Sequence, residues 1–130
     1  MIVMDGKNTA MGRLASYVAK EALKGAEIAV VNCEEIIITG NKKWISQDLE
    51  LRKTRIGNNR QGPKFSFTVT NIVKRCIRGM IPHHDHGRGR EAFRRIKCYP
   101  NVPQEFEGKE KISLQKENRK KFAYVKDVAR

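Results

Sequence analysis

The first half of the chain opens with a short apolar run and an amphipathic segment. Residues 2–5 (IVMD) are apolar and end at a turn, which is typical of a buried strand. Over residues 11–23, apolar side chains recur at i, i+3, i+4 and i+7, so this segment is predicted to be a helix. Asn8 or Thr9 can cap its start, and Gly25 can end it.

Two further apolar runs follow the helix. Residues 28–32 (IAVVN) and 36–39 (IIIT) are apolar at consecutive positions, which favours strands covered on both faces, as in a parallel sheet. A strand, a helix and a strand within about thirty residues make a βαβ unit. The pattern therefore predicts an α/β fold with helices over a mostly parallel sheet.

The middle of the chain alternates between helix and loop signals. Residues 42–55 are predicted to be a weakly amphipathic helix anchored by Trp44, Ile45 and Leu49. Residues 56–67 are rich in Gly, Asn and Pro and are predicted to be a loop.

Helical periodicity returns over residues 70–80, with Thr70 as a candidate cap and Pro82 after its end. A short helix over 89–95 and a last strand over 96–99 are expected next.

Two prolines, Pro100 and Pro103, are predicted to end the compact core. We therefore expect an α/β domain over residues 1–103. Residues 104–130 form a charged extension that packs on the surface or on neighbouring molecules.

Charge changes this picture most. The formal net charge is +13, and residues 52–97 hold thirteen Lys and Arg against the two acids Asp85 and Glu91. A concentrated block of this kind indicates a polyanionic partner. Nucleic acid is favoured over an acidic membrane, because no basic amphipathic helix with bulky apolar residues is present.

Other features of the sequence argue against a secreted, membrane-spanning or disulfide-linked protein. Neither a signal peptide nor an apolar stretch of membrane-spanning length is visible. The three cysteines are odd in number and far apart, which is typical of buried thiols in a cytoplasmic protein. We expect no cofactor, no membrane partner and no homo-oligomer.

The segment RGMIPHHDHGRGR, residues 78–90, raises the question of a metal site. Histidine and aspartate are ligand types, but H-H-D-H lacks the i, i+4 spacing of a helical site, and flanking arginines oppose a cation. Solvated loop histidines are the simpler interpretation. Contact of these histidines with phosphates or bases is favoured further, so no metal site is predicted.

An enzyme is the second alternative. The segment DGKNTAMGRLAS lies between a strand and a helix, but it matches neither phosphate-binding glycine motif. Gly12 is interpreted as a small residue for close helix–sheet packing, which leaves Arg13 free to meet a phosphate. No nucleophile has a base partner in the sequence, so no catalytic residue is predicted. A metal- or nucleotide-dependent enzyme using residues 78–90 and a general DNA-compacting protein remain as alternatives.

Binding of a folded RNA explains the basic block best. Aromatic residues are sparse, and no helix-turn-helix or zinc-finger spacing appears, so recognition by shape and phosphates is expected. The predicted RNA-binding residues are cations, histidines and one amide on loops and outer helix faces: Arg13, Lys42, Lys43, Arg52, Arg55, Asn59, Arg60, Lys64, Lys74, Arg75, Arg78, His83, His84, Arg88, Arg90, Arg94, Arg95 and Lys97.

Five segments in this order resemble one known family. They are MGRLAS (11–16), VVNCEEIIITG (30–40), NNRQGP (58–63), RGMIP (78–82) and GRGREAFRRIKCY (87–99). Together they resemble the universal large-subunit ribosomal protein family numbered thirteen, in its archaeal and eukaryotic-like form. The segment HHDHGRG departs from the lysine or threonine more usual there, so the resemblance assigns no role to His83, His84 or His86.

The resemblance implies a three-layer α/β/α domain around a four-stranded parallel sheet. It implies a structural, non-enzymatic role in the large ribosomal subunit. The expected partners are large-subunit rRNA and neighbouring ribosomal proteins, with participation in subunit assembly.

Overall fold

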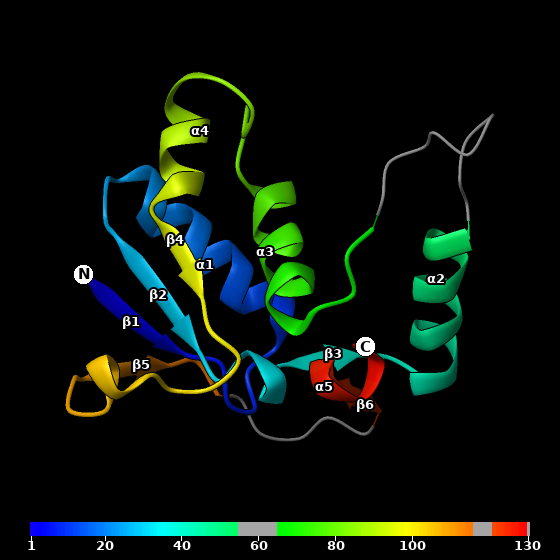
Figure 1. The fold of residues 1–130 in the computed structure, drawn as a ribbon. Coiled ribbons are helices and arrows are strands. Elements are labelled where there is room, and N and C mark those ends of the chain that lie inside the picture. The colour runs from blue at the N-terminus through cyan, green and yellow to red at the C-terminus, as the bar shows by residue number, and fades with distance from the viewer. Residues whose placement is uncertain (55–64, 116–120, 130) are drawn as a thin grey trace.

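A computed structural model of the chain describes residues 1–54, 65–115 and 121–129 (Figure 1). Most of the loop predicted over residues 56–67 lies outside these ranges. No helix among the described residues is long and apolar enough to cross a membrane.

A four-stranded parallel sheet forms the centre of the fold. Its strands are β1 (Ile2–Asp5), β2 (Ile28–Val31), β4 (Ile96–Cys98) and β5 (Lys111–Ser113), in the order β4-β2-β1-β5. β1 pairs with β2 from Ile2 opposite Ile28, and with β5 from Val3 opposite Lys111. The predicted βαβ start and the α/β fold class are confirmed.

Three helices cover one face of this sheet: α1 (Met11–Leu23), α3 (Val69–Met80) and α4 (Gly87–Arg94) (Figure 1). α1 packs against both α3 and α4, and all three helices contact the main sheet, α1 at β2 and the other two at β4. The apolar faces of α1 and α3 meet the side chains of Met4, Ile28 and Val30 in one buried cluster. Burial of these faces is the main source of stability for the helices.

The opposite face of the sheet has a thinner cover. Alternate residues of β1 and β2 point to this side, where Val3, Ala29 and Val31 pack against Phe106. Phe106 lies in the short 3-10 helix η3 (Gln104–Phe106). The core therefore continues beyond Pro103, and the extension supplies both this cover and strand β5.

The predicted strand over 36–39 forms, but not in the parallel sheet. β3 (Ile37–Thr39) pairs antiparallel with β6 (Phe122–Tyr124) in a second, two-stranded sheet. After β2 the chain passes through Asn32 with φ 54° and the 3-10 helix η1 (Cys33–Glu35), which turns it away from the main sheet. A short apolar run does not distinguish these two sheet environments.

The second sheet supports two more helices. α5 (Val125–Val128) follows β6 directly, and α2 (Lys42–Thr54) packs mainly against α5 and β6. Leu49 is the one buried residue of α2, and it packs against Ala123 and Val128. In Figure 1, α2 accordingly stands to one side of the helices that cover the main sheet.

The predicted helix caps are corrected. α1 begins after Ala10, because Asn8 and Thr9 are held elsewhere. The Asn8 amide donates to the Glu35 carbonyl at 3.1 Å, and the Ile37 amide donates to the Thr9 carbonyl at 2.9 Å. For α3, Thr68 rather than Thr70 occupies the N-cap position.

Gly12 does not serve close packing against the sheet. It is exposed, and a Cβ built on it would meet no atom within 4 Å. The end of the helix is as predicted: Gly25 follows α1 with φ 102°, a backbone conformation that favours glycine.

Candidate nucleic-acid interface

Helix α3 carries cations on both sides of its buried stripe. Ile72, Val73 and Ile77 face α1 and the sheet. The Lys74 ammonium lies 5.2 Å from the centre of the Phe93 ring, which belongs to α4. The Arg75 guanidinium lies on the other side, 4.2 Å from the centre of the Phe65 ring.

An exposed turn with three histidines joins α3 to α4. His83 has φ 50°, and its ring lies 5.0 Å from that of His86. The Asp85 carboxylate is 2.9 Å from Nδ1 of His86. A backbone hydrogen bond, the hydrogen bond to His86 and the charges of nearby histidines lower the pKa of Asp85.

Close backbone contact fixes this turn against α4. Gly89 is buried, and a Cβ at this position would run into the carbonyl groups of Pro82 and His83. Only glycine allows this approach without a shift of the backbone. The turn therefore has a defined position relative to the first residues of α4.

The arginines of α4 fall into two groups. Arg88 donates to the Leu23 carbonyl at 3.0 Å, and Arg95, directly after the helix, lies 3.7 Å from Glu91. Arg90 and Arg94 are exposed, and among the described residues no acid pairs with them. They are four positions apart and share one side of the helix.

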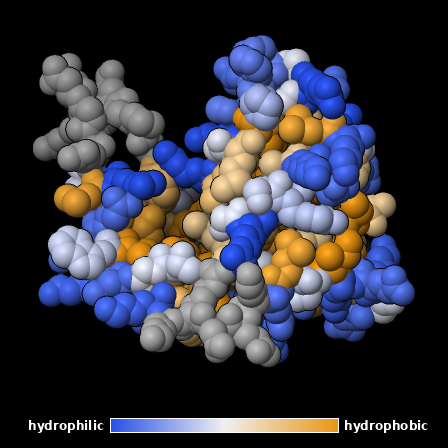
Figure 2. Space-filling model, turned by 180° about the vertical axis from the view of Figure 1, so that it is seen from behind, coloured by the Kyte–Doolittle hydropathy of each residue, from blue (hydrophilic) through white to orange (hydrophobic). Residues whose placement is uncertain are grey.

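Together these residues form one surface, which we call the α3–α4 basic surface. Figure 2 shows hydrophilic side chains gathered at the top of the molecule. The surface contains Lys74, Arg78, His83, His84, His86, Arg88, Arg90, Arg94 and Arg95.

Several other residues that were predicted to bind RNA do not lie on the α3–α4 basic surface. Lys97 is exposed on β4, but strand alternation turns it away from Ile96, which faces the helices. Arg13 borders a separate concavity with Tyr17 and Lys20 of α1 and Leu114 after β5. The predicted residues Arg55, Asn59, Arg60 and Lys64 lie outside the described residues.

The concavity beside Arg13 shows what the sequence prediction missed. Arg13, Tyr17 and Lys20 are at i, i+4 and i+7 and so share the polar side of α1. This spacing was visible in the sequence, but all three residues lie outside the basic block, and only Arg13, in the first turn of the helix, was expected to meet a phosphate.

Three predicted residues lie on α2. Lys42 is 3.4 Å from Asp127 of α5, and Arg52 is 2.9 Å from Asp48 one turn earlier. Lys43 is exposed, and its backbone amide donates to the Asn41 side chain. α3 lies between α2 and α4 (Figure 1), so these cations do not join the arginines of α4.

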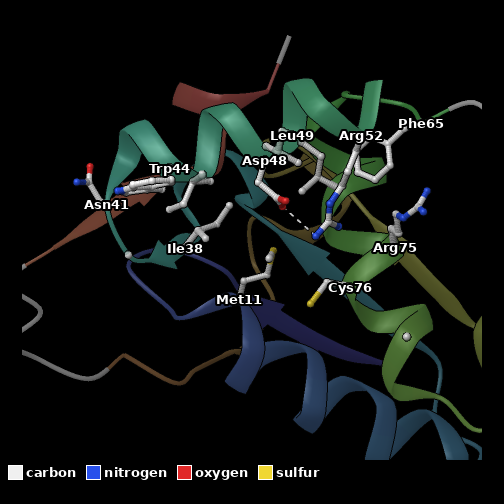
Figure 3. A pocket seen from close by; sticks show the side chains of 14 residues that line it. Met11, Ile38, Asn41, Trp44, Asp48, Leu49, Arg52, Phe65, Arg75 and Cys76 are labelled. Atoms are coloured by element: carbon white, nitrogen blue, oxygen red, sulfur yellow. Dashed lines mark ion pairs between the residues drawn. The ribbon is translucent and has the colours of Figure 1, made fainter. Parts of the chain in front are cut away.

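A groove of about 540 Å³ separates α2 from α3 (Figure 3). Its lining is mainly apolar and includes Met11, Ile38, Leu49, Ile72 and Cys76. Figure 3 shows Asn41 and Trp44 at one end of the groove, and Arg52, Phe65 and Arg75 at the other.

Trp44 corrects a prediction, because it does not anchor α2. Its side chain is 71% exposed at the edge of the groove. α2 rests on α5 and β6 through Leu49, and Trp44, more than one turn earlier, is not part of that buried cluster.

Positive charges crowd the other end of the groove. Partial burial and the neighbouring charges of Arg78 and Arg52 lower the pKa of Arg75. An anion bound there would relieve this repulsion.

The cysteines differ in their surroundings. Cys33 is fully buried, and its thiol lies within hydrogen-bonding reach of that of Cys98, which raises the pKa of Cys33. The same contact and the charge of Lys74 lower the pKa of Cys98. Burial raises the pKa of Cys76. None of the three forms a disulfide.

Comparison with known proteins agrees with the resemblance of the five segments. The sequence profile of the family described as "Ribosomal protein L13" matches residues 1–105. The chain is 48% identical over 107 residues to the large ribosomal subunit protein uL13 of Methanococcus maripaludis, covering 80% of this chain and 77% of the relative.

Two further relatives extend the match. The uL13 protein of Methanocaldococcus jannaschii is 45% identical over 116 residues, covering 87% of this chain and 84% of the relative. The uL13 protein of Methanococcoides burtonii is 34% identical over 135 residues, covering 100% of this chain and 96% of the relative. The match thus includes the C-terminal segment that supplies β5, β6 and α5. The chain therefore belongs to the ribosomal protein L13 family, whose members are structural proteins and not enzymes.

Proposed function

We propose that this protein is a structural component of the large ribosomal subunit that binds folded large-subunit rRNA through the α3–α4 basic surface and takes part in subunit assembly. The family supports the ribosomal part of this proposal, since the relatives bear the name of a large-subunit protein. Neighbouring ribosomal proteins are proposed as further partners.

The observation that carries the RNA-binding part is the pair Arg90 and Arg94. Both are exposed on a helix whose position the close approach of Gly89 fixes, and no acid among the described residues pairs with either. Arginine has a planar fork of donors that can span two phosphate oxygens. A rigid helix that presents two such forks suits the repeating phosphates of an RNA backbone.

Binding of this kind depends on salt in a predictable way. Each phosphate that a cation neutralises releases condensed counterions, so affinity falls as salt rises. The α3–α4 basic surface recognises the shape and the backbone charge of folded RNA. The histidines of its turn add hydrogen-bond donors and flat rings that can contact exposed sugars and bases. This mode of binding needs no cofactor.

The first test replaces Arg90 and Arg94 by alanine. We expect weaker binding to large-subunit rRNA and a salt slope that is shallower by up to about two units, because two phosphate contacts are lost. Filter binding over a salt series measures both quantities.

The matched control replaces Lys7 and Lys109 by alanine. Both are exposed cations outside the α3–α4 basic surface, so net charge changes by the same amount. If both double variants lose equal affinity and slope, binding follows net charge alone and the assigned surface is wrong.

A second test addresses the ribosomal role directly. A native lysate is sedimented on a sucrose gradient before and after a high-salt wash, and the protein is detected in each fraction. We expect it to remain with the large subunit through the wash. Its presence only at the top of the gradient at low salt would overturn the ribosomal assignment.

Two alternatives remain, a metal- or nucleotide-dependent enzyme that uses residues 78–90 and a general DNA-compacting protein. Among the described residues, no group of three or more His, Cys, Asp or Glu side chains is arranged to hold a metal ion. His83 and His86 come together, but Asp85 turns its carboxylate to the His86 ring. A DNA-compacting protein would bind duplex DNA as tightly as rRNA, which the same filter assay measures.

A further inference from the structure

The groove between α2 and α3 is a second concave surface, separate from the turn and helix α4 that dominate the α3–α4 basic surface. One wall is α2, which rests on the second sheet, and the other is α3, which rests on the main sheet. The groove is bordered along α2 from Asn41 to Arg52, a helical length of about 16 Å. In an extended single strand this length corresponds to a few nucleotides.

The two ends of the groove differ in chemistry. At one end, Trp44 presents its ring to solvent beside the Asn41 side chain. At the other end, Arg52 and Arg75 lie at the groove and Arg78 is close enough to repel Arg75. Among the described residues that line the groove, Asp48 is the only acid, and it pairs with Arg52.

We propose that this groove holds a short unpaired stretch of RNA, with one base stacked on Trp44 and neighbouring phosphates bound by Arg52 and Arg75. The proposal deepens the proposed function and rests on it, because it assigns a second contact with the same class of partner. It specifies single-stranded nucleotides, whereas the α3–α4 basic surface binds the backbone of folded RNA.

Stacking is the natural use of an exposed indole next to cations. Bases stack on aromatic rings with little dependence on sequence, and arginine adds charge pairing to the backbone. The Arg75 guanidinium lies 4.2 Å from the centre of the Phe65 ring, and the residue is exposed, so its N–H groups can also donate to a phosphate. The Asn41 amide can hydrogen-bond the edge of a base stacked on Trp44.

Charge favours RNA over a segment of a neighbouring protein. An apolar side chain could fill the floor formed by Met11, Ile38 and Cys76. It would not relieve the repulsion that Arg78 and Arg52 exert on Arg75, which no acid pairs with among the described residues. A strand of RNA can interact with both ends of the groove, because it offers a base to Trp44 and phosphates to Arg52 and Arg75.

The test uses the full chain and the fluorescence of Trp44, which is its single tryptophan. The probes are an oligoribonucleotide of about eight nucleotides and mixed sequence, and a blunt RNA duplex of about 16 base pairs. We expect the single strand to quench Trp44 fluorescence and the duplex to leave it nearly unchanged.

Variants assign the quenching to stacking. Trp44→Ala should weaken single-strand binding about tenfold, as measured by anisotropy of labelled RNA, whereas Trp44→Phe should recover much of the affinity because it keeps a ring. Leu51→Ala is the matched control, since Leu51 is 56% exposed on the same helix but does not line the groove. Thermal melting confirms that each variant is folded.

The outcomes separate this inference from the proposed function. If Trp44→Ala binds the single strand as tightly as the unchanged protein, the groove does not hold RNA. If Trp44 stays open to acrylamide quenching in the complex with large-subunit rRNA, the groove is left to a neighbouring protein. Either result would overturn this inference. If binding to large-subunit rRNA were normal at the same time, the proposed function would still hold. Failure to bind rRNA at all would overturn both.

Discussion

At the scale of single residues, Gly89 has the most demanding place in the molecule. Its α-carbon packs against the carbonyl groups of Pro82 and His83, where a methyl group has no room. We predict that Gly89→Ala lowers the free energy of unfolding by about 1–3 kcal/mol, since the turn or α4 must move. Urea denaturation measures the change.

Gly12 provides the matched control for this substitution. It is also helical, but a Cβ there would meet nothing within 4 Å. Gly12→Ala should therefore be neutral or stabilise the protein by up to about 1 kcal/mol, because alanine favours helix. A loss of stability at Gly12 equal to that at Gly89 would contradict the assignment of Gly89.

The cysteines are predicted to react with iodoacetamide in a fixed order. Cys98 should be alkylated first, because its lowered pKa gives more thiolate near neutral pH and its side chain is half-buried. Cys76 should follow, and Cys33 should react only on unfolding. Mass spectrometry of peptides gives the order.

The pH dependence of this reaction has a definite sign. Raising the pH from about 7 to about 9 should accelerate Cys76 more than Cys98, since the Cys98 thiol is already more ionised. Lys74→Ala should slow Cys98, because the charge of Lys74 contributes to its lowered pKa. Equal rates for Cys76 and Cys98 at both pH values would refute these pKa directions.

At the scale of elements, η3 is predicted to contribute strongly to stability, although it lies in the C-terminal extension. Phe106 is 3% exposed and covers Val3, Ala29 and Val31. Phe106→Ala should lower the free energy of unfolding by about 3–5 kcal/mol. Phe122, which is 39% exposed in β6, is the control, and its replacement by alanine should cost much less. Chemical denaturation of both variants checks this, and equal losses would show that η3 does not cover the sheet.

The elements also show what the sequence could predict. The period of α1 and the continuous apolar run of β2 indicated their types, and the structure confirms both. β5 was not predicted, because Lys111, Ile112 and Ser113 lack an apolar run and only pairing with β1 makes them a strand.

The candidate site was also predictable only in part. The basic block gave the cations of α3 and α4, but not the side of the helix or sheet on which each lies. Arg75 faces the groove, Lys74 faces α4, and Lys97 lies on the other side of the sheet. These directions depend on which faces the core buries, which charge alone does not specify.

At the scale of the whole molecule, the charge of +13 is predicted to limit stability in the absence of RNA. Like charges repel in the compact state, and added salt screens them. Raising sodium chloride from about 0.01 M to about 0.5 M should therefore raise the melting temperature by about 4 °C or more, as measured by circular dichroism. A melting temperature that falls over this range would show that attractive ion pairs dominate instead.

The position of β5 beside β1 has a consequence for the order in which the chain is made. β1 is synthesised before the other strands of the main sheet, yet one of its edges pairs with residues 111–113, which follow it in the sequence after β2 and β4. During translation, β1 and β2 can pair while that edge of β1 stays open, and an open edge is a site for pairing with other chains. A nascent chain thus completes its main sheet only after residues 111–113 have been synthesised, and a chain that stops before them would expose the edge of β1.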